Sequence, residues 1–199
     1  MMQPFSNPAL DKKHTIRYGM FMKTLSKNDW LREGLAILST EDFASITIDN
    51  LCKRLSITKG SFYHHFKNSE KYIEDLMIFW MEQNTLEPIR LTSLPTVTNK
   101  SERLHELARI VDHKAEQRIR AWSFSHPVVK EYVQKVDALR IEYLIDLSLL
   151  EGFEPIEARR LAMLDYSALV GFQQLFSDLP EAEVSDFWQF STFCYQKRI

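Results

Sequence analysis

The sequence predicts an all-α protein, and three observations lead to this prediction. Only five glycines and seven prolines interrupt 199 residues, so the chain has few breaks and favours long helices. Apolar side chains recur three and four residues apart in most segments. Ser, Thr, Asn and Asp, the residues that cap helix N-termini well, precede several of these segments.

The composition is typical of a soluble globular protein, with 45% apolar and 26% charged residues. The apolar runs are too short or too interrupted by charge to span a bilayer, and the first residues lack the order of a secretory signal. Cys52 and Cys194 fall in separate helical patterns, which is typical of a reducing compartment. We therefore expect a cytoplasmic protein with no membrane partner.

Charge is distributed unevenly along the chain. Residues 1–72 carry 11 Lys and Arg against 7 Asp and Glu, a net charge of +4, whereas residues 73–199 carry 14 against 20, a net charge of −6. A basic first third is typical of a protein whose N-terminal end meets a polyanion. This interpretation needs a motif in the basic part, because a chance fluctuation of this size also occurs.

The N-terminal part is predicted to contain several short helices. Residues 1–25 show no clear period and are expected to form a basic arm or an extra short helix. An amphipathic helix begins at Asn28 or Asp29 and ends near Glu41. Thr47 caps a helix over residues 48–55, and Thr58 caps another over residues 59–65.

Only three residues, Ser56, Ile57 and Thr58, separate those two short helices, which is the turn length of a helix-turn-helix. Ser69 is predicted to cap the next helix, over residues 70–83. The predicted N-terminal domain therefore spans residues 26–72, with a linking helix to about residue 86.

Residues 73–199 are predicted to form a second helical domain. Pro88 and Pro95 indicate a linker over residues 87–99, and Ser101 caps a helix that reaches about residue 123 with one break. Further helices are predicted from residue 127 to Gly152, from residue 155 to about 176, and from about residue 181 to the basic tail.

The stretch TKGSFYHHF, residues 58–66, gathers the most distinctive side chains. His64 and His65 are adjacent, and neighbours on a helix point about 100° apart, so they cannot share a metal ion. Neither histidine has a Cys, Asp or Glu four residues further on. We therefore expect no metal site and no cofactor.

A nucleic-acid interpretation accounts for these residues together. In a helix-turn-helix, the N-terminal part of the second helix enters the major groove and presents side chains to base edges. Lys59, Ser61 and His64 can donate hydrogen bonds there, Gly60 removes bulk, and Tyr63 carries a phenol that can reach phosphate. The same pattern predicts that Phe62 and Phe66 face inward.

The run ITIDNLCKRLSITKGSFYHHFKNSE, residues 46–70, resembles the DNA-binding domain of the tetracycline-repressor (TetR) family. The resemblance covers roughly fifty residues when the preceding helix is included. It implies an all-helical homodimer with three DNA-binding helices, a connecting helix and a C-terminal domain that holds a ligand and dimerises. It places DNA contacts at Thr47, Lys59, Gly60, Ser61, Tyr63, His64 and Lys67, with His65 as a further candidate.

The chain departs from the family pattern at three positions. Ser56 and Asp42 stand where the family usually has glycine, and each would cost about 1 kcal/mol if its backbone were left-handed. Ser69 stands where a phosphate-binding lysine is common, which should weaken DNA binding without changing sequence preference.

Function in the C-terminal half is less well marked. Aromatic residues and polar residues beside apolar stripes are candidates for a ligand pocket: Trp80, Arg120, Trp122, Arg140, Tyr143, Asp165, Phe172 and Gln173. The last two helices carry apolar side chains that suit a four-helix dimer interface: Leu161, Ala168, Leu169, Phe176, Val184, Phe187, Phe190 and Cys194. An ordinary core explains each of the aromatic residues among the pocket candidates at least as well.

The sequence contains no nucleophile elbow, phosphate-binding loop or paired carboxylates with a plausible base, so we predict that it is not an enzyme. We expect a dimeric regulator that binds operator DNA, in the form of a repressor released by an unknown small-molecule effector. The alternative is a constitutive, nucleoid-type DNA-binding protein with a filled C-terminal core.

Overall fold

The computed structural model describes residues 25–176 and 178–196, with the side chains of Glu181 and residues 191–196 left out. Every regular element in those residues is a helix, which confirms the predicted all-α class. The predicted basic arm lies almost wholly outside the described residues, as do the end of the chain and the side chain of Cys194. None of the described helices combines the length and the apolar character needed to cross a bilayer.

The helices of the N-terminal part begin and end close to the predicted positions. They are α1 (Lys27–Thr40), the 3-10 turn η1 (Phe43–Ser45), α2 (Ile48–Leu55) and α3 (Lys59–His65). The bounds of α2 and α3 agree with the prediction, whereas α1 begins earlier than Asn28. Ser26 is its N-cap, and the Ser26 and Asp29 side chains form a reciprocal capping box.

The predicted linker over residues 87–99 is wrong in its first half. After α4 (Ser69–Met81) the chain continues through a π-helical turn, η2 (Glu82–Leu86), directly into α5 (Glu87–Thr92). Pro88 lies in the first turn of α5, where the missing N–H group disturbs a helix least. The cap of α4 is also one residue earlier than predicted, because the side chain of Asn68 accepts from the Lys71 N–H.

The remaining helices are α6 (Lys100–Arg109), α7 (His113–Trp122), α8 (Pro127–Leu150), α9 (Pro155–Leu175) and α10 (Glu181–Gln196). The break between α6 and α7 was predicted, but Asn99 rather than Ser101 caps α6. Gly152 ends α8 with a φ of 94°, a left-handed backbone that glycine adopts without strain.

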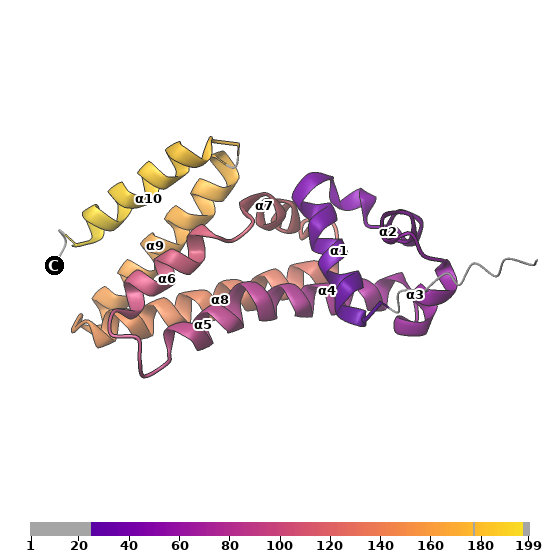
Figure 1. Cartoon of the computed structure of the whole chain (residues 1–199). Coiled ribbons are helices and arrows are strands. Elements are labelled where there is room, and N and C mark those ends of the chain that lie inside the picture. Colours follow the sequence, from indigo (N-terminus) through magenta and orange to yellow (C-terminus); the bar gives the residue numbers. More distant parts are fainter. Residues whose placement is uncertain (1–24, 177, 197–199) are drawn as a thin grey trace, which may run out of the picture.

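The molecule is elongated, with α1 to α3 at one end and α9 and α10 towards the other (Figure 1). The continuous α4–η2–α5 helix and α8 run side by side between these ends (Figure 1). One buried apolar cluster extends from Trp30 in α1, through Trp80 in α4 and Trp122 in α7, to Val136 in α8. The N-terminal helices are thus packed firmly onto the rest of the chain.

Candidate nucleic-acid interface and cavity

Helix α3 has one face in the core and one face in solvent. Phe62 and Phe66 are 0% and 1% exposed, and their rings pack 5.5 Å and 6.4 Å from the ring of Trp30. Tyr63, one position further on, is 56% exposed. The inward direction of the two phenylalanines agrees with the sequence prediction.

The residues predicted to contact DNA lie on or beside the outer face of α3. Lys59, Gly60, Tyr63 and His64 are exposed on it. Ser61 and His65 are half-buried, and the His65 ring lies 6.5 Å from that of Trp30. Thr47, at the start of α2, and Lys67, just after α3, are exposed. The structure therefore gathers all eight residues around α2 and α3, and their DNA contacts remain a prediction.

Lys59 has a partner that sequence reasoning missed. Its ammonium nitrogen lies 2.6 Å from a carboxylate oxygen of Asp49, in the first turn of α2. The hydrogen bond and the charge of Asp49 raise the pKa of Lys59, so the lysine stays protonated. Both side chains are well exposed, so the pair can open to let Lys59 meet a phosphate or a base.

The turn between α2 and α3 uses a left-handed residue. Ser56 has a φ of 56° and a ψ of 43°, and its N–H donates back to carbonyl groups of the last turn of α2. A residue other than glycine costs free energy at this position only if its backbone is left-handed, and the backbone of Ser56 is left-handed. Asp42 does not share this geometry: its φ is −69°, and its side chain caps η1 instead.

Polar contacts hold α2 and α4 against α1. Arg54 of α2 pairs with Glu33 and, at 2.8 Å, with Glu41. The Tyr72 hydroxyl of α4 donates a hydrogen bond of 2.9 Å to the Trp30 carbonyl oxygen. Gly34 permits this approach, since a Cβ atom there would lie 2.2 Å from the Tyr72 oxygen. These contacts hold the two helices that flank α3 in the chain against α1.

This arrangement of α1 to α4 coincides with a known domain. Residues 31–74 match the family model described as "Bacterial regulatory proteins, tetR family". The chain carries the N-terminal helix-turn-helix domain of the TetR family. That family consists of DNA-binding transcriptional regulators and is not a family of enzymes. No curated protein matches the sequence.

The TetR-family domain is joined to the body through α7 as well as through α4. The rings of Phe43, in η1, and Trp122, in α7, stack with centroids 5.7 Å apart and planes 7° from parallel. Arg118 of α7 donates a hydrogen bond of 2.6 Å to the carbonyl oxygen of Leu38 in α1. Helix α7 therefore contacts the TetR-family domain directly.

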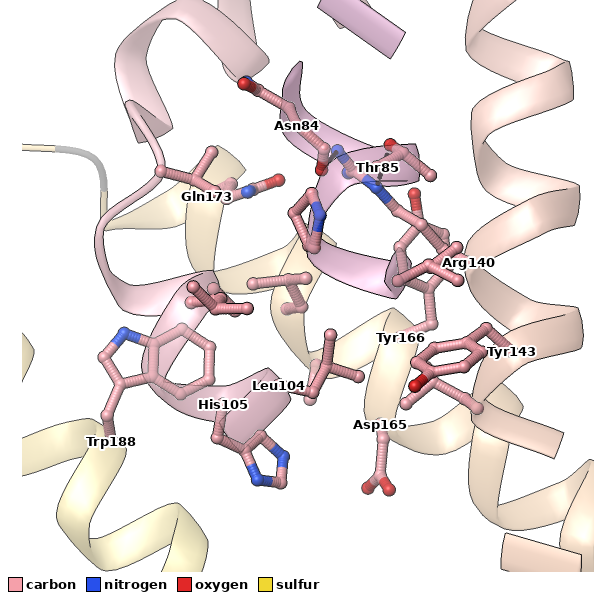
Figure 2. A pocket seen from close by; sticks show the side chains of 18 of the residues that line it. Asn84, Thr85, Leu104, His105, Arg140, Tyr143, Asp165, Tyr166, Gln173 and Trp188 are labelled. Atoms are coloured by element: carbon pink, nitrogen blue, oxygen red, sulfur yellow. Dashed lines mark hydrogen bonds between the residues drawn. The ribbon is translucent and has the colours of Figure 1, made fainter. Parts of the chain in front are cut away.

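A cavity of about 210 Å³ lies in the body, between η2, α5, α6, α8, α9 and α10 (Figure 2). Of the eight residues predicted to bind ligand, Arg140, Tyr143, Asp165 and Gln173 line it. The other four do not belong to its lining: Trp80, Arg120, Trp122 and Phe172. Thr85 and Asn84 also line it but were missed, because nothing in their spacing distinguishes them from ordinary helix residues.

Arg140, which lines the cavity, belongs to a buried ion pair. The Arg140 guanidinium lies 3.1 Å from both carboxylate oxygens of Glu116, which is 3% exposed. Burial raises the pKa of Glu116, but the charge of Arg140 and hydrogen bonds from Arg140, Asn84 and Trp80 outweigh it, so the pKa is lowered. Trp80, predicted as a ligand residue, thus serves this pair through a 2.8 Å hydrogen bond.

A second polar group adjoins the cavity. Arg120 binds both oxygens of Asp137, at 2.7 Å and 3.0 Å, and the Tyr166 hydroxyl donates to Asp137 at 2.6 Å. Burial and the carboxylate raise the pKa of Tyr166 to about 12. Arg120, a predicted ligand residue, is therefore engaged in holding α7 to α8 and α9.

Residues predicted for the dimer interface fall into two groups. Ala168, Phe176 and Phe190 are exposed. The half-buried ones are Leu161, Leu169, Val184 and Phe187. Phe187 stacks on Phe172 within the same chain, with centroids 4.6 Å apart.

Helix α9 exposes further apolar side chains that the sequence analysis did not select: Ile156, Met163, Leu164 and Leu175. With Ala168 and Gly171 they recur along one side of the helix. An apolar stripe of this kind is typical of an interface.

Metal ligands are not grouped among the described residues: no three or more His, Cys, Asp or Glu side chains there are arranged to hold an ion. His64 and His65 form a T-shaped ring contact with each other, with centroids 5.1 Å apart.

Proposed function

We propose that the protein is a homodimeric repressor that leaves its operator when a small molecule occupies the cavity beside Arg140. The observation that carries the proposal is the single helical path α4–η2–α5. It begins at Ser69, four residues after α3 ends, and its η2 segment supplies Asn84 and Thr85 to the cavity wall. A ligand in the cavity therefore touches the same helical rod that positions the DNA-binding end.

Release follows from a difference in affinity between two arrangements of the dimer. Two α3 helices must lie about 34–36 Å apart to enter successive major grooves on one side of DNA. We call the DNA-binding domain of each subunit, α1 to α3, its head. A ligand that binds more tightly when the two heads are further apart shifts the population away from the form that can bind DNA. The contacts of α7 with the head, at Phe43 and Leu38, offer a second route for this shift.

Dimerisation through α9 and α10 is supported by their exposed apolar side chains. Leu175 is 74% exposed and Phe190 is 64% exposed, and such side chains gain free energy when a second copy covers them. Met163→Glu places a charge in this stripe and should give a monomer in sedimentation equilibrium. Gln134→Glu, which adds the same charge on an exposed position of α8, should stay dimeric.

The proposal is tested by fluorescence anisotropy on DNA from upstream of the protein's own gene, across a salt series. Affinity should fall steeply with salt, because Lys and Arg contacts to phosphate release counterions. Metabolites are first screened for those that raise the melting temperature of the protein. Those compounds are then added to the protein–DNA complex, and at least one should release the DNA. DNA binding that is absent or independent of salt would contradict the proposal that the protein is a DNA-binding regulator. Ligands that bind the protein without releasing the DNA would favour a constitutive DNA-binding protein.

A further inference from the structure

We infer that the cavity binds a small, uncharged and mainly apolar molecule, of about one or two aromatic rings. The inference rests on the proposed function, since it concerns the effector of the same site. It follows from the state of the polar groups around the cavity, not from its apolar walls alone.

The walls are predominantly aliphatic. They come from α5, α6, α8 and α9 and from the segment between α6 and α7, and their apolar members are Pro88, Ile89, Leu104, Leu107, Ala108, Val111, Leu144, Leu164, Ala168 and Leu169. Trp188 of α10 lies on the side opposite Arg140 (Figure 2). Such walls favour a ligand with a large apolar surface.

Arg140 is the cation of the lining, but an anionic ligand cannot readily use it. Its Nε donates to the Thr85 hydroxyl at 3.0 Å, and its Nη2 donates to the Asn84 carbonyl oxygen at 3.1 Å. Its Nη1 and Nη2 also donate to the two oxygens of Glu116, which Trp80 and Asn84 also bind. A ligand carboxylate would have to displace Glu116 and leave that charge buried without its partner, which is strongly unfavourable.

The other polar side chains of the lining also have partners within the protein. The Tyr143 hydroxyl is 2.6 Å from that of Thr92, and the Gln173 amide is 3.3 Å from His113 Nδ1. The Tyr166 hydroxyl donates to Asp137. His105, Asp165 and Trp188 have interactions of their own as well.

Charges near the cavity are therefore committed in pairs. Glu116 is matched by Arg140, and Asp137 is matched by Arg120. A cationic ligand would have to compete with an arginine for the carboxylate of Glu116 or Asp137, and an anionic ligand would have to displace Glu116 from Arg140. An uncharged ligand meets neither penalty.

The volume limits the size of the ligand. A dry apolar cavity of about 150 Å³ is enough to bind benzene. At about 210 Å³ this cavity is somewhat larger and accepts a substituted single ring or a fused pair. A long lipid chain or a multi-ring drug would need the walls to move apart.

The test uses one ring system with three charges: naphthalenemethanol, naphthoate and naphthylmethylammonium, titrated into the full-length protein by calorimetry at neutral pH without DNA. The alcohol should bind at least ten times more tightly than either ion. Equal or tighter binding of an ion, or no binding of the alcohol up to its solubility limit, would overturn the inference.

Two variants locate the binding. Ala108→Phe fills the cavity and should remove binding of the alcohol, whereas Ala138→Phe, on an exposed position of α8, should leave it unchanged. Retained binding in a folded Ala108→Phe protein would place the ligand elsewhere and count against the inference. Glu116→Gln removes the carboxylate that pairs with Arg140. The ratio between the affinity of the protein for the alcohol and its affinity for naphthoate should therefore become smaller.

A separate anisotropy measurement with operator DNA distinguishes this inference from the proposed function. An alcohol that binds the protein but does not release DNA contradicts the effector-released repressor and leaves the ligand class intact. An ion that binds best and releases DNA contradicts the ligand class and leaves the repressor intact.

Discussion

The ammonium nitrogen of Lys59 lies 2.6 Å from the carboxylate of Asp49, so the first residue of α3 is paired with an acid of α2. The pair stands on the face that carries the predicted DNA contacts. Lys59 must exchange Asp49 for DNA when it binds, and the Asp49 charge repels phosphate.

Asp49→Asn should therefore increase operator affinity by about three- to tenfold at low salt, since it removes the competing partner and the repulsion. The increase should shrink as salt is added. Fluorescence anisotropy at several salt concentrations measures both. Glu142→Gln removes the same charge at an exposed position of α8 and should have no effect on operator affinity. An equal gain in affinity in that control would mean that the net charge of the protein, and not the Lys59–Asp49 pair, causes the increase.

Tyr63 and Phe62 are neighbours with opposite surroundings, which predicts opposite effects of the same substitution. Tyr63→Ala should abolish operator binding while leaving the melting temperature nearly unchanged, because the side chain is 56% exposed. Lys59→Ala should do the same. Phe62→Ala should instead cost about 3–5 kcal/mol of stability, since it leaves a cavity beside Trp30. Thermal unfolding that showed Tyr63→Ala to be as damaging as Phe62→Ala would make Tyr63 a structural residue.

The left-handed backbone of Ser56 predicts a stabilising substitution. Ser56→Gly removes the Cβ strain at a φ of 56° and should raise the free energy of unfolding by about 0.5–1 kcal/mol. Ala138→Gly, within α8, should lower it by about 1 kcal/mol. Urea denaturation measures both, and two changes of the same sign would contradict the backbone explanation.

The Glu116–Arg140 pair predicts a reversal of pH dependence. In the native protein the pKa of Glu116 is lowered, so its stabilising contribution is present above the ordinary carboxyl pKa of about 4.3 and is lost as pH falls through the lowered value. Arg140→Met removes the partner and leaves burial, which raises the pKa of Glu116. The variant should lose about 3–5 kcal/mol at pH 7 and recover part of it towards pH 5, as Glu116 takes up a proton.

Denaturant unfolding at the two pH values measures this effect. The double variant Arg140→Met, Glu116→Leu should lose the recovery at low pH, because it contains no buried acid at this position. If it retained the recovery, another group would be responsible.

Sequence patterns predicted local features well where one chain segment determines them. The bounds of α2 and α3, the inward direction of Phe62 and Phe66, and the end of α8 at Gly152 all follow from capping residues, apolar spacing and glycine. The continuation of α4 into α5 did not follow, because Pro88 is a helix breaker in most contexts and a good residue in a first turn.

The cavity lining could be predicted only in part, because it is a tertiary property. Arg140 and Gln173 stood out as polar residues near apolar stripes, and both line the cavity. Arg120 stood out for the same reason and Trp122 stood out as an aromatic residue, but Arg120 pairs with Asp137 and Trp122 stacks on Phe43. The spacing of apolar and polar residues along the chain does not predict which distant residue either side chain contacts.

The π-helical turn at Glu82–Leu86 changes the rotational phase of the rod that runs from the DNA-binding head to the cavity. One extra residue in a turn rotates everything after it by about 100° around the axis. An uninterrupted α-helix would thus have aimed Pro88 and Ile89 away from the space they now enclose, while leaving Tyr72 and Trp80 where they are. The part of the helix before the π-helical turn can therefore face the buried core while the part after it faces the cavity, although these two directions do not coincide on a regular α-helix.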